Sequence, residues 1–130
     1  MQKYTTILKT LGDPTRLRIL RLLLDAGAEL CVCEFVDSLE EPQYNVSKHL
    51  AALRTAGMLQ SRKEGRWVYY RPADSPEAFQ DFLCQAVAEI PTAVIAQDRK
   101  ELRKRLKLRE GGKCLRGVQK EHLLGKATVS

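Results

Sequence analysis

Two cysteines separated by a single residue are the most chemically suggestive feature of this 130-residue chain. Cys31 and Cys33 are too close in sequence to form a disulfide easily, and thiolates are soft ligands that suit As(III), Sb(III) or soft divalent metals such as Cd²⁺. Free cysteine also packs as a small buried hydrophobic residue, so the pair has an inert alternative. On an ideal helix the two side chains would point about 200° apart, so chelation by both is expected to distort the start of their helix.

A second informative feature is a helix pattern followed at once by a hairpin pattern. Residues 44–57 place Val46, Leu50 and Leu53 on one face of a helix, with small and polar residues on the other. Two short β-prone runs flank residues 63–65, which is a hairpin signal. This layout is typical of a winged helix-turn-helix, in which the helix enters the major groove and the hairpin grips the backbone nearby.

The distribution of charge supports that interpretation better than the formal net charge of +6 does. Residues 1–98 contain 11 Lys and Arg against 13 Asp and Glu, whereas residues 99–130 contain 11 against 3. Within the first part, residues 42–71 contain six basic residues and one acidic residue, Glu64. Positive charge is therefore concentrated on the two elements that would meet phosphate.

We predict DNA contacts from the outward face of this helix and from the hairpin. The predicted residues are Gln43, Tyr44, Asn45, Ser47, Lys48, Arg62, Lys63 and Arg66. The Gln43 amide can read adenine edges, and Ser47 can meet either a base or a phosphate. The alternative, a solvated helix face, is common, but the adjacent basic hairpin favours DNA contact.

His49 and the aromatic residues of the hairpin are expected to pack within the protein rather than to contact nucleic acid. His49 lies beside the buried stripe, so we expect a packed, hydrogen-bonded histidine before a phosphate contact. Trp67, Tyr69 and Tyr70 resemble a stacking platform for single-stranded nucleic acid, but their alternation is more typical of packing within the hairpin. The expected partner is therefore double-stranded DNA and not RNA.

Composition limits the remaining classes of function. Hydrophobic residues make up 44% of the chain and aromatic residues 6%, which favours helices over a β-sandwich. No apolar run approaches the roughly 20 residues that span a bilayer, and residues 1–4 lack a signal-peptide core, so we expect a cytoplasmic protein. The sequence contains no nucleophile–base or phosphate-loop arrangement, so we expect no enzyme, and DNA binding needs no cofactor.

The predicted fold is mainly α with a small β-hairpin, in the order α-α-α-α-β-β-α. We expect residues 1–98 to form one winged helix-turn-helix domain for DNA binding and dimerisation, and residues 99–130 to form a basic, mobile tail. Residues 99–109 within that tail have a helical pattern, and Gly111-Gly112 marks the start of its mobile part. The predicted dimer interface combines apolar residues of the first and last helices: Tyr4, Ile7, Leu8, Leu11, Phe79, Phe82, Val87 and Ile90.

Four motifs in this order resemble the ArsR/SmtB family of metal-sensing repressors. They are LGDPTRLRIL at 11–20, ELCVCE at 29–34, VSKHL at 46–50 and GRWVYY at 65–70. The resemblance covers about residues 4 to 90. It implies a homodimer whose first and last helices form the interface, and which releases an operator with dyad symmetry when a metal or metalloid arrives.

The motif at 29–34 is similar to the arsenite-sensing cysteine box of arsenic repressors, which has a third cysteine three residues after the second. This chain has Val36 at that position, so a trigonal thiolate site needs a third sulfur from elsewhere. Cys84 and Cys114 are the candidates, and we favour Cys114 because a flexible tail can reach the site from either protomer. The predicted ligands are Cys31, Cys33 and Cys114, with As(III), Sb(III) or a soft divalent metal as inducer.

Other functions stay open beside this one. A regulator of the same fold could respond to thiol oxidation or to no ligand, and a non-regulatory protein could use its basic tail to bind nucleic acid. The zinc site that the resemblance implies on the last helix is not matched here, because that helix has no histidine and only Asp81 and Glu89.

Overall fold

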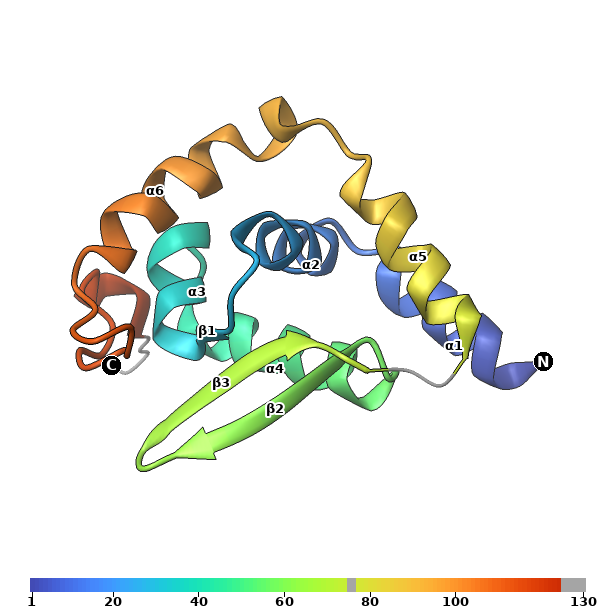
Figure 1. Cartoon of the computed structure of the whole chain (residues 1–130), viewed down its shortest axis with the longest axis horizontal. Helices are drawn as coiled ribbons and strands as arrows, with labels where there is room; N and C mark the ends of the chain where they lie inside the picture. Colours follow the sequence, from blue (N-terminus) through green and yellow to red (C-terminus); the bar gives the residue numbers. More distant parts are fainter. Residues whose placement is uncertain (75–76, 125–130) are drawn as a thin grey trace.

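The computed structural model describes residues 1–74 and 77–124 (Figure 1). Its elements follow in this order: α1 (Gln2–Leu11), α2 (Pro14–Ala26), β1 (Leu30–Cys31), α3 (Val32–Leu39), α4 (Gln43–Thr55), β2 (Leu59–Glu64), β3 (Trp67–Pro72), α5 (Ala78–Ala88), the 3-10 helix η1 (Thr92–Ile95), α6 (Ala96–Leu106) and the 3-10 helix η2 (Glu121–Leu124). The predicted helices and hairpin are confirmed. Ser75 and Pro76 lie outside the described residues.

Helix α2 lies at the centre of the fold, and its ends are set by local sequence. The Asp13 side chain accepts a hydrogen bond from the Arg16 backbone N–H at 3.1 Å, and Pro14 occupies the first turn, where its missing N–H costs nothing. Gly27 ends the helix in the left-handed region, with φ of 62°. The other helices surround the buried residues of α2: Ile19, Leu20, Leu22 and Leu23.

The sheet has three strands in the order β1-β3-β2, one more than the predicted hairpin. Strands β2 and β3 pair antiparallel around a tight turn, where Gly65 adopts a φ of 61°. The two-residue β1 pairs with β3 on the other side and sets Cys31 opposite Tyr69. The start of α3 is therefore attached to the hairpin through β1.

Helix α4 buries the predicted stripe of Val46, Leu50 and Leu53 completely. It packs against α3 and continues into β2, so its opposite face is left outward beside the hairpin (Figure 1). Gly57, with φ of 80°, follows the helix and lets the chain reverse into β2. The helix and hairpin are thus held as one unit, as the winged helix-turn-helix prediction requires.

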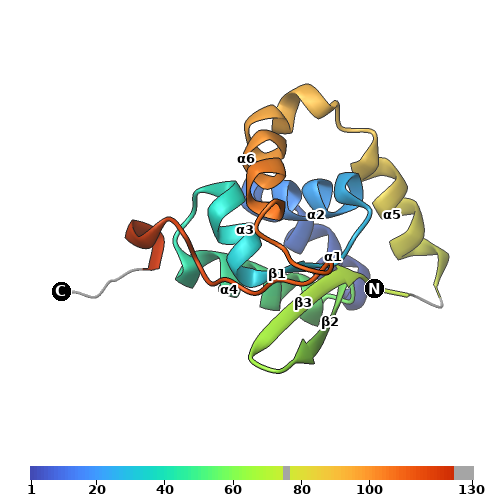
Figure 2. The same ribbon diagram turned by 60° about the vertical axis from the view of Figure 1, so that its left-hand side comes forward.

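The C-terminal part of the chain differs from the expected mobile tail. Residues 96–106 form α6, which packs along α3, and the chain then returns across α3 to end at η2 (Figures 1 and 2). Leu102 and Leu123 belong to the same buried core as the helices of residues 1–98. The sequence predicts a basic, mobile tail here, whereas Arg105 and Arg109 each meet a buried carboxylate on α3. Residues 125–130 lie outside the described residues.

Helices α1 and α5 lie side by side at the other end of the molecule. The Tyr4 and Phe79 rings meet edge to face at 4.9 Å, and Ile7 is buried beneath them. Leu8 and Phe82 are exposed on the outer surface of this pair. Within residues 1–74 and 77–124, none of the helices combines the length and apolar character that a membrane span needs.

Candidate metal centre and nucleic-acid interface

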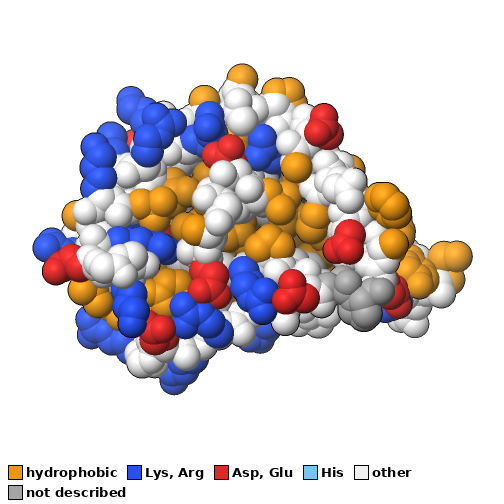
Figure 3. Space-filling model, in the orientation of Figure 1, with side chains coloured by type: hydrophobic (Ala, Val, Ile, Leu, Met, Phe, Trp, Pro, Cys, Tyr) orange, Lys and Arg blue, Asp and Glu red, His pale blue; other side chains and the backbone are white. Residues whose placement is uncertain are grey.

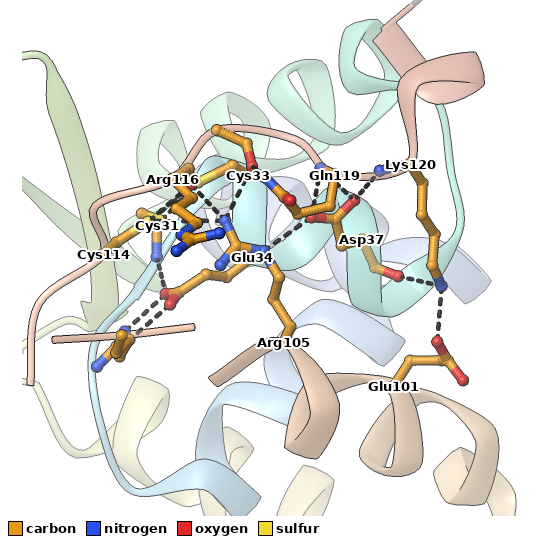
Figure 4. A network of polar contacts seen from close by, with 12 residues as sticks. Cys31, Cys33, Glu34, Asp37, Glu101, Arg105, Cys114, Arg116, Gln119 and Lys120 are labelled. Atoms are coloured by element: carbon orange, nitrogen blue, oxygen red, sulfur yellow. Dashed lines mark hydrogen bonds and ion pairs between the residues drawn. The ribbon is translucent and has the colours of Figure 1, made fainter. Parts of the chain in front are cut away.

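Three cysteine sulfurs meet at one buried point beside the start of α3 (Figure 4). Cys31 Sγ lies 2.9 Å from Cys33 Sγ and 2.8 Å from Cys114 Sγ, and the Cys33 and Cys114 sulfurs are 3.2 Å apart. All three side chains are buried. The structure therefore brings together the three residues that the sequence prediction selected as metal ligands.

Cys31 and Cys33 reach this point without distortion of the helix, because only Cys33 lies within it. Cys31 is the residue before α3 and has extended backbone angles, φ −90° and ψ 163°. The 200° divergence applies only when both residues are helical, and here the change of backbone direction at Cys31 turns its side chain toward Cys33. The Glu34 carboxylate accepts the Cys31 backbone N–H at 3.0 Å and stabilises this turn.

Cys114 is held in place by two elements. Its backbone N–H donates to the Tyr69 hydroxyl at 2.9 Å, which ties it to β3. The Arg105 guanidinium donates to the carbonyl oxygens of Arg116 and Gly117 and lies 3.8 Å from the Cys114 sulfur. The sequence prediction relied on a flexible tail to deliver this cysteine, whereas here hydrogen bonds position it.

Two buried ion pairs fasten this C-terminal segment to α3. Arg109 donates to both Glu34 carboxylate oxygens, each at 2.6 Å, in a bidentate pair. Arg105 donates to Asp37 at 2.7 Å, and Asp37 also accepts backbone N–H groups, including that of Lys120 at 2.9 Å. A buried carboxylate is costly unless it is paired and hydrogen-bonded, so these contacts require the segment to dock (Figure 4).

The three thiols share their protons unequally. Hydrogen bonding from Cys31, helped by Cys114 and by the Arg105 charge, lowers the pKa of Cys33 to about 7. The same hydrogen bond to Cys33, together with burial, raises the pKa of Cys31, and burial raises the pKa of Cys114. These shifts favour the thiolate form at Cys33 over the other two sulfurs.

The sulfur positions come closer to a three-coordinate pyramidal centre than to a planar one, although each separation is shorter than either geometry gives. Metal–thiolate bonds of about 2.3 Å place sulfurs roughly 3.3 Å apart at right angles and roughly 4.0 Å apart in a plane. The separations of 2.8 to 3.2 Å lie nearer the pyramidal value. Among the described residues, the group contains no histidine or carboxylate, which a closed four-coordinate zinc site of mixed ligands would need.

The predicted DNA-contacting residues of α4 lie on its outward side. Tyr44 is 72% exposed, and Lys48 Nζ lies 5.6 Å from the centre of its ring. Ser47 is also exposed, whereas Gln43 and Asn45 are half-buried. This face presents one positive charge with hydroxyl and amide groups, which suits contact with bases and phosphates.

The hairpin residues differ among themselves. Lys63 and Arg66 are exposed, and the Arg66 guanidinium lies 4.6 Å from the centre of the Trp67 ring. Arg62 is already paired with Glu29 at 2.8 Å and Glu64 at 3.0 Å, so a phosphate would have to displace these carboxylates. Figure 3 shows Lys and Arg side chains gathered over the hairpin and over α6.

The remaining sequence candidates fall outside both sites. His49 Nδ1 accepts a hydrogen bond from Arg16 Nε at 3.0 Å, as expected of a packed histidine. Cys84 is half-buried against the main core and is not part of the sulfur group, although the sequence pattern set it off the apolar face. Sequence reasoning missed the ion pairs that position Cys114. Local sequence held no signal for them, because Arg105 and Arg109 pair with Asp37 and Glu34, which lie 68 and 75 residues away in sequence.

Comparisons with known proteins identify a family of transcriptional regulators. The model of the bacterial regulatory protein, arsR family, matches residues 13–61. The uncharacterized HTH-type transcriptional regulator MJ1325 of Methanocaldococcus jannaschii is 47% identical over 77 residues, which are 57% of this chain and 85% of that protein. The arsenical resistance operon repressor of Escherichia coli is 49% identical over 65 residues, which are 50% of this chain and 55% of that protein. The chain thus spans only about half the length of that repressor.

Solved structures show the same fold. Reduced HlyU from Vibrio cholerae has a TM-score of 0.54 and 36% sequence identity, and covers 65% of this chain and 88% of its own. Rv0081 from M. tuberculosis also has a TM-score of 0.54, with 31% identity over 75% of this chain and 92% of its own. Both likenesses leave at least a quarter of this chain unmatched.

Proposed function

We propose that this chain, which belongs to the ArsR family of bacterial regulatory proteins, releases its operator DNA when arsenite or antimonite binds to Cys31, Cys33 and Cys114. It is a DNA-binding transcriptional repressor by family and by fold, and the inducer is the proposal. The observation that carries it is the meeting of three buried sulfurs within 3.2 Å of one another.

The chemistry of this site suits a trivalent metalloid. As(OH)₃ would exchange three As–O bonds for three As–S bonds, and each thiol proton would leave with a hydroxide as water, with no change of oxidation state. Where a sulfur is already present as thiolate, the hydroxide that leaves arsenic would take its proton from solvent. Ligand sets made only of sulfur select soft ions. Three thiolates complete the coordination of As(III) or Sb(III), so no fourth donor is needed.

The relatives' names support the same class of inducer without deciding it. One is named an arsenical resistance operon repressor of Escherichia coli, and another is a cadmium resistance regulatory protein CadC homolog from Staphylococcus aureus. Cadmium is therefore the alternative that the test must include. A repressor acts where its operator is, so the proposal places the protein in the cytoplasm.

DNA binding is assigned to α4 and the hairpin. Tyr44, Ser47 and Lys48 form the exposed face of α4, and Lys63 and Arg66 extend it along the hairpin. Two copies would be joined through α1 and α5, where Leu8 and Phe82 expose apolar surface, and would present two such faces to an operator with dyad symmetry.

A second candidate is a repressor that responds to thiol oxidation. The Cys31 and Cys114 sulfurs are 2.8 Å apart, and a peroxide could join them by removing two electrons and two protons to form one S–S bond. A disulfide would then tie the segment that carries Cys114 to Cys31, as a bound metalloid would in the first proposal. Both candidates use the same cysteines, so an assay has to distinguish thiol oxidation from metalloid binding.

The test is operator release measured side by side with As(III), Sb(III), Cd²⁺, Zn²⁺ and peroxide. We expect As(III) and Sb(III) to weaken operator binding by about 5- to 150-fold, the usual range of such coupling. Cys31→Ser and Cys33→Ser should bind the operator normally and lose this response, while Cys84→Ser serves as the matched control. Release by peroxide alone would support the oxidation candidate, and a normal arsenite response in both Cys31→Ser and Cys33→Ser would overturn the arsenite proposal.

A further inference from the structure

The C-terminal segment that carries Cys114 continues from the sulfur site to the DNA-reading helix. We call residues 113–124 the strap. We propose that the docked strap and operator DNA exclude each other, and that the inducer releases DNA by holding the strap closed. This inference rests on the proposed function and deepens it, because it names the element that couples the site to α4.

The strap is anchored at three successive points along its path. Cys114 fixes its beginning among the sulfurs. Its middle lies on α3, where Asp37 accepts the Lys120 backbone N–H and Lys120 Nζ reaches Glu101 at 2.7 Å. Its end, η2, lies against α4 with Leu123 only 6% exposed (Figure 2). A change in how Cys114 is bound can therefore alter the contact between η2 and α4.

The strap and the DNA-reading side chains face one shared hollow. This hollow has a volume of about 380 Å³, and its walls come from the sulfur site, α4, the hairpin and the strap. Its lining includes Cys33, Gln43, Ser47, Arg66, Val118 and Leu124. The strap thus borders the same hollow as Gln43 and Ser47, two predicted base- or phosphate-contacting residues of α4.

The dimensions of DNA leave no room for both. An α-helix with its side chains is roughly 10–12 Å across, and the major groove is roughly 12 Å wide, so a helix seated in the groove fills it. Gln43 and Ser47 are one turn apart on the same side of α4, and Leu124 lies beside them. A chain running along that side occupies the place of the DNA backbone at the first turn of the helix.

The inducer acts on this competition through the third sulfur. Cys31 and Cys33 belong to the body of the fold and Cys114 to the strap, so a ligand bonded to all three binds the closed strap better than the open one. A ligand shifts such an equilibrium only by its differential affinity for the two states. In its absence the strap is held only by hydrogen bonds, ion pairs and apolar contacts, and operator DNA competes with these contacts.

The test uses the full chain and a variant that frees the end of the strap. Leu123→Asn removes the apolar anchor against α4 without adding charge, and Leu115→Asn, at a position that is 46% exposed on the same strap, is the matched control. Arsenite binding is followed by the absorption of the arsenic–thiolate bonds, and operator affinity by fluorescence anisotropy with and without arsenite.

We expect Leu123→Asn to bind one arsenite per chain as the wild type does, and to bind the operator at least as tightly without arsenite. Its arsenite-induced loss of affinity should fall to less than about a quarter of the wild-type factor, while Leu115→Asn should match the wild type. Lys120→Gln, which loses the ion pairs to Glu40 and Glu101, should shift the factor in the same direction and gives the test if Leu123→Asn does not fold.

Two results would overturn the coupling through the strap and leave the proposed function intact. One is full arsenite release in both Leu123→Asn and Lys120→Gln. The other is weaker operator binding by Leu123→Asn without arsenite, which would mean that the docked strap supports DNA binding. Arsenite that leaves wild-type operator affinity unchanged would instead overturn the proposed function, and the coupling through the strap with it.

Discussion

The buried ion pair between Arg105 and Asp37 is the contact on which the position of Cys114 most depends. Both side chains are about as buried as the core, at 4% and 3% exposed, and Arg105 also holds the carbonyls of Arg116 and Gly117. Arg105→Met keeps the apolar stem but leaves the Asp37 carboxylate with backbone N–H partners only. Removing one partner of a buried ion pair costs about 3–5 kcal/mol, so we expect the free energy of unfolding to fall by that order.

Urea unfolding at a fixed protein concentration measures this effect, because the apparent stability of the proposed dimer would depend on concentration. Arg103→Met, an exposed arginine on the same helix, is the control and should change stability by less than about 0.5 kcal/mol. Asp37→Leu in the Arg105→Met background removes the unpaired charge and should recover part of the loss. A loss below about 1 kcal/mol in Arg105→Met would show that the segment is not fastened as described.

Other predictions concern DNA binding, assembly and acid stability. Lys48→Ala and Arg66→Ala should weaken operator binding without unfolding, and Arg66→Ala should lower the slope of log affinity against log salt by about one unit; unchanged affinity in both would remove the docking of α4 and the hairpin. Leu8→Asp should give a monomer or an unfolded chain in sedimentation, and a stable wild-type monomer at micromolar concentration would contradict the proposed dimer. Asp13→Ala should cost about 1 kcal/mol at neutral pH through loss of the helix cap. The hydrogen bond from Arg16 N–H lowers the pKa of Asp13, so this stabilisation is present above the unfolded pKa near 3.9 and is lost as pH falls through the lower folded value. Unfolding curves of the two proteins should therefore converge in acid, and a constant difference down to the acid limb would contradict the cap.

Local patterns carried the prediction of the DNA-reading half. The stripe of Val46, Leu50 and Leu53 has helical spacing, and Gly65 marks a tight turn between β-prone runs, so neighbours in sequence decide both elements. The two-residue β1 was missed because a strand of that length has no pattern of its own. It exists because β3 offers it a pairing edge.

The sulfur site was predicted in its members but not in its geometry. Counting ligands identified the need for a third thiolate, and Cys114 was favoured because a tail could reach the site. The orientation of Cys31 depends on its extended backbone before α3, which spacing alone does not show. The docking of residues 107–124 depends on charges more than 60 residues apart in sequence, as in the contact between Arg105 and Asp37. Such pairs leave no periodic signal, so a basic segment reads as solvated.

The most direct test of the central claim is an arsenite titration of operator-bound protein, wild type against Cys114→Ser, followed by anisotropy of labelled operator. Three-sulfur binding predicts that one arsenite per chain releases the wild type, whereas Cys114→Ser needs at least about 10-fold more arsenite or fails to release. Cys84→Ser should titrate as the wild type does. Release of Cys114→Ser at the wild-type arsenite concentration would contradict the account, because the inducer would then act without the strap's cysteine.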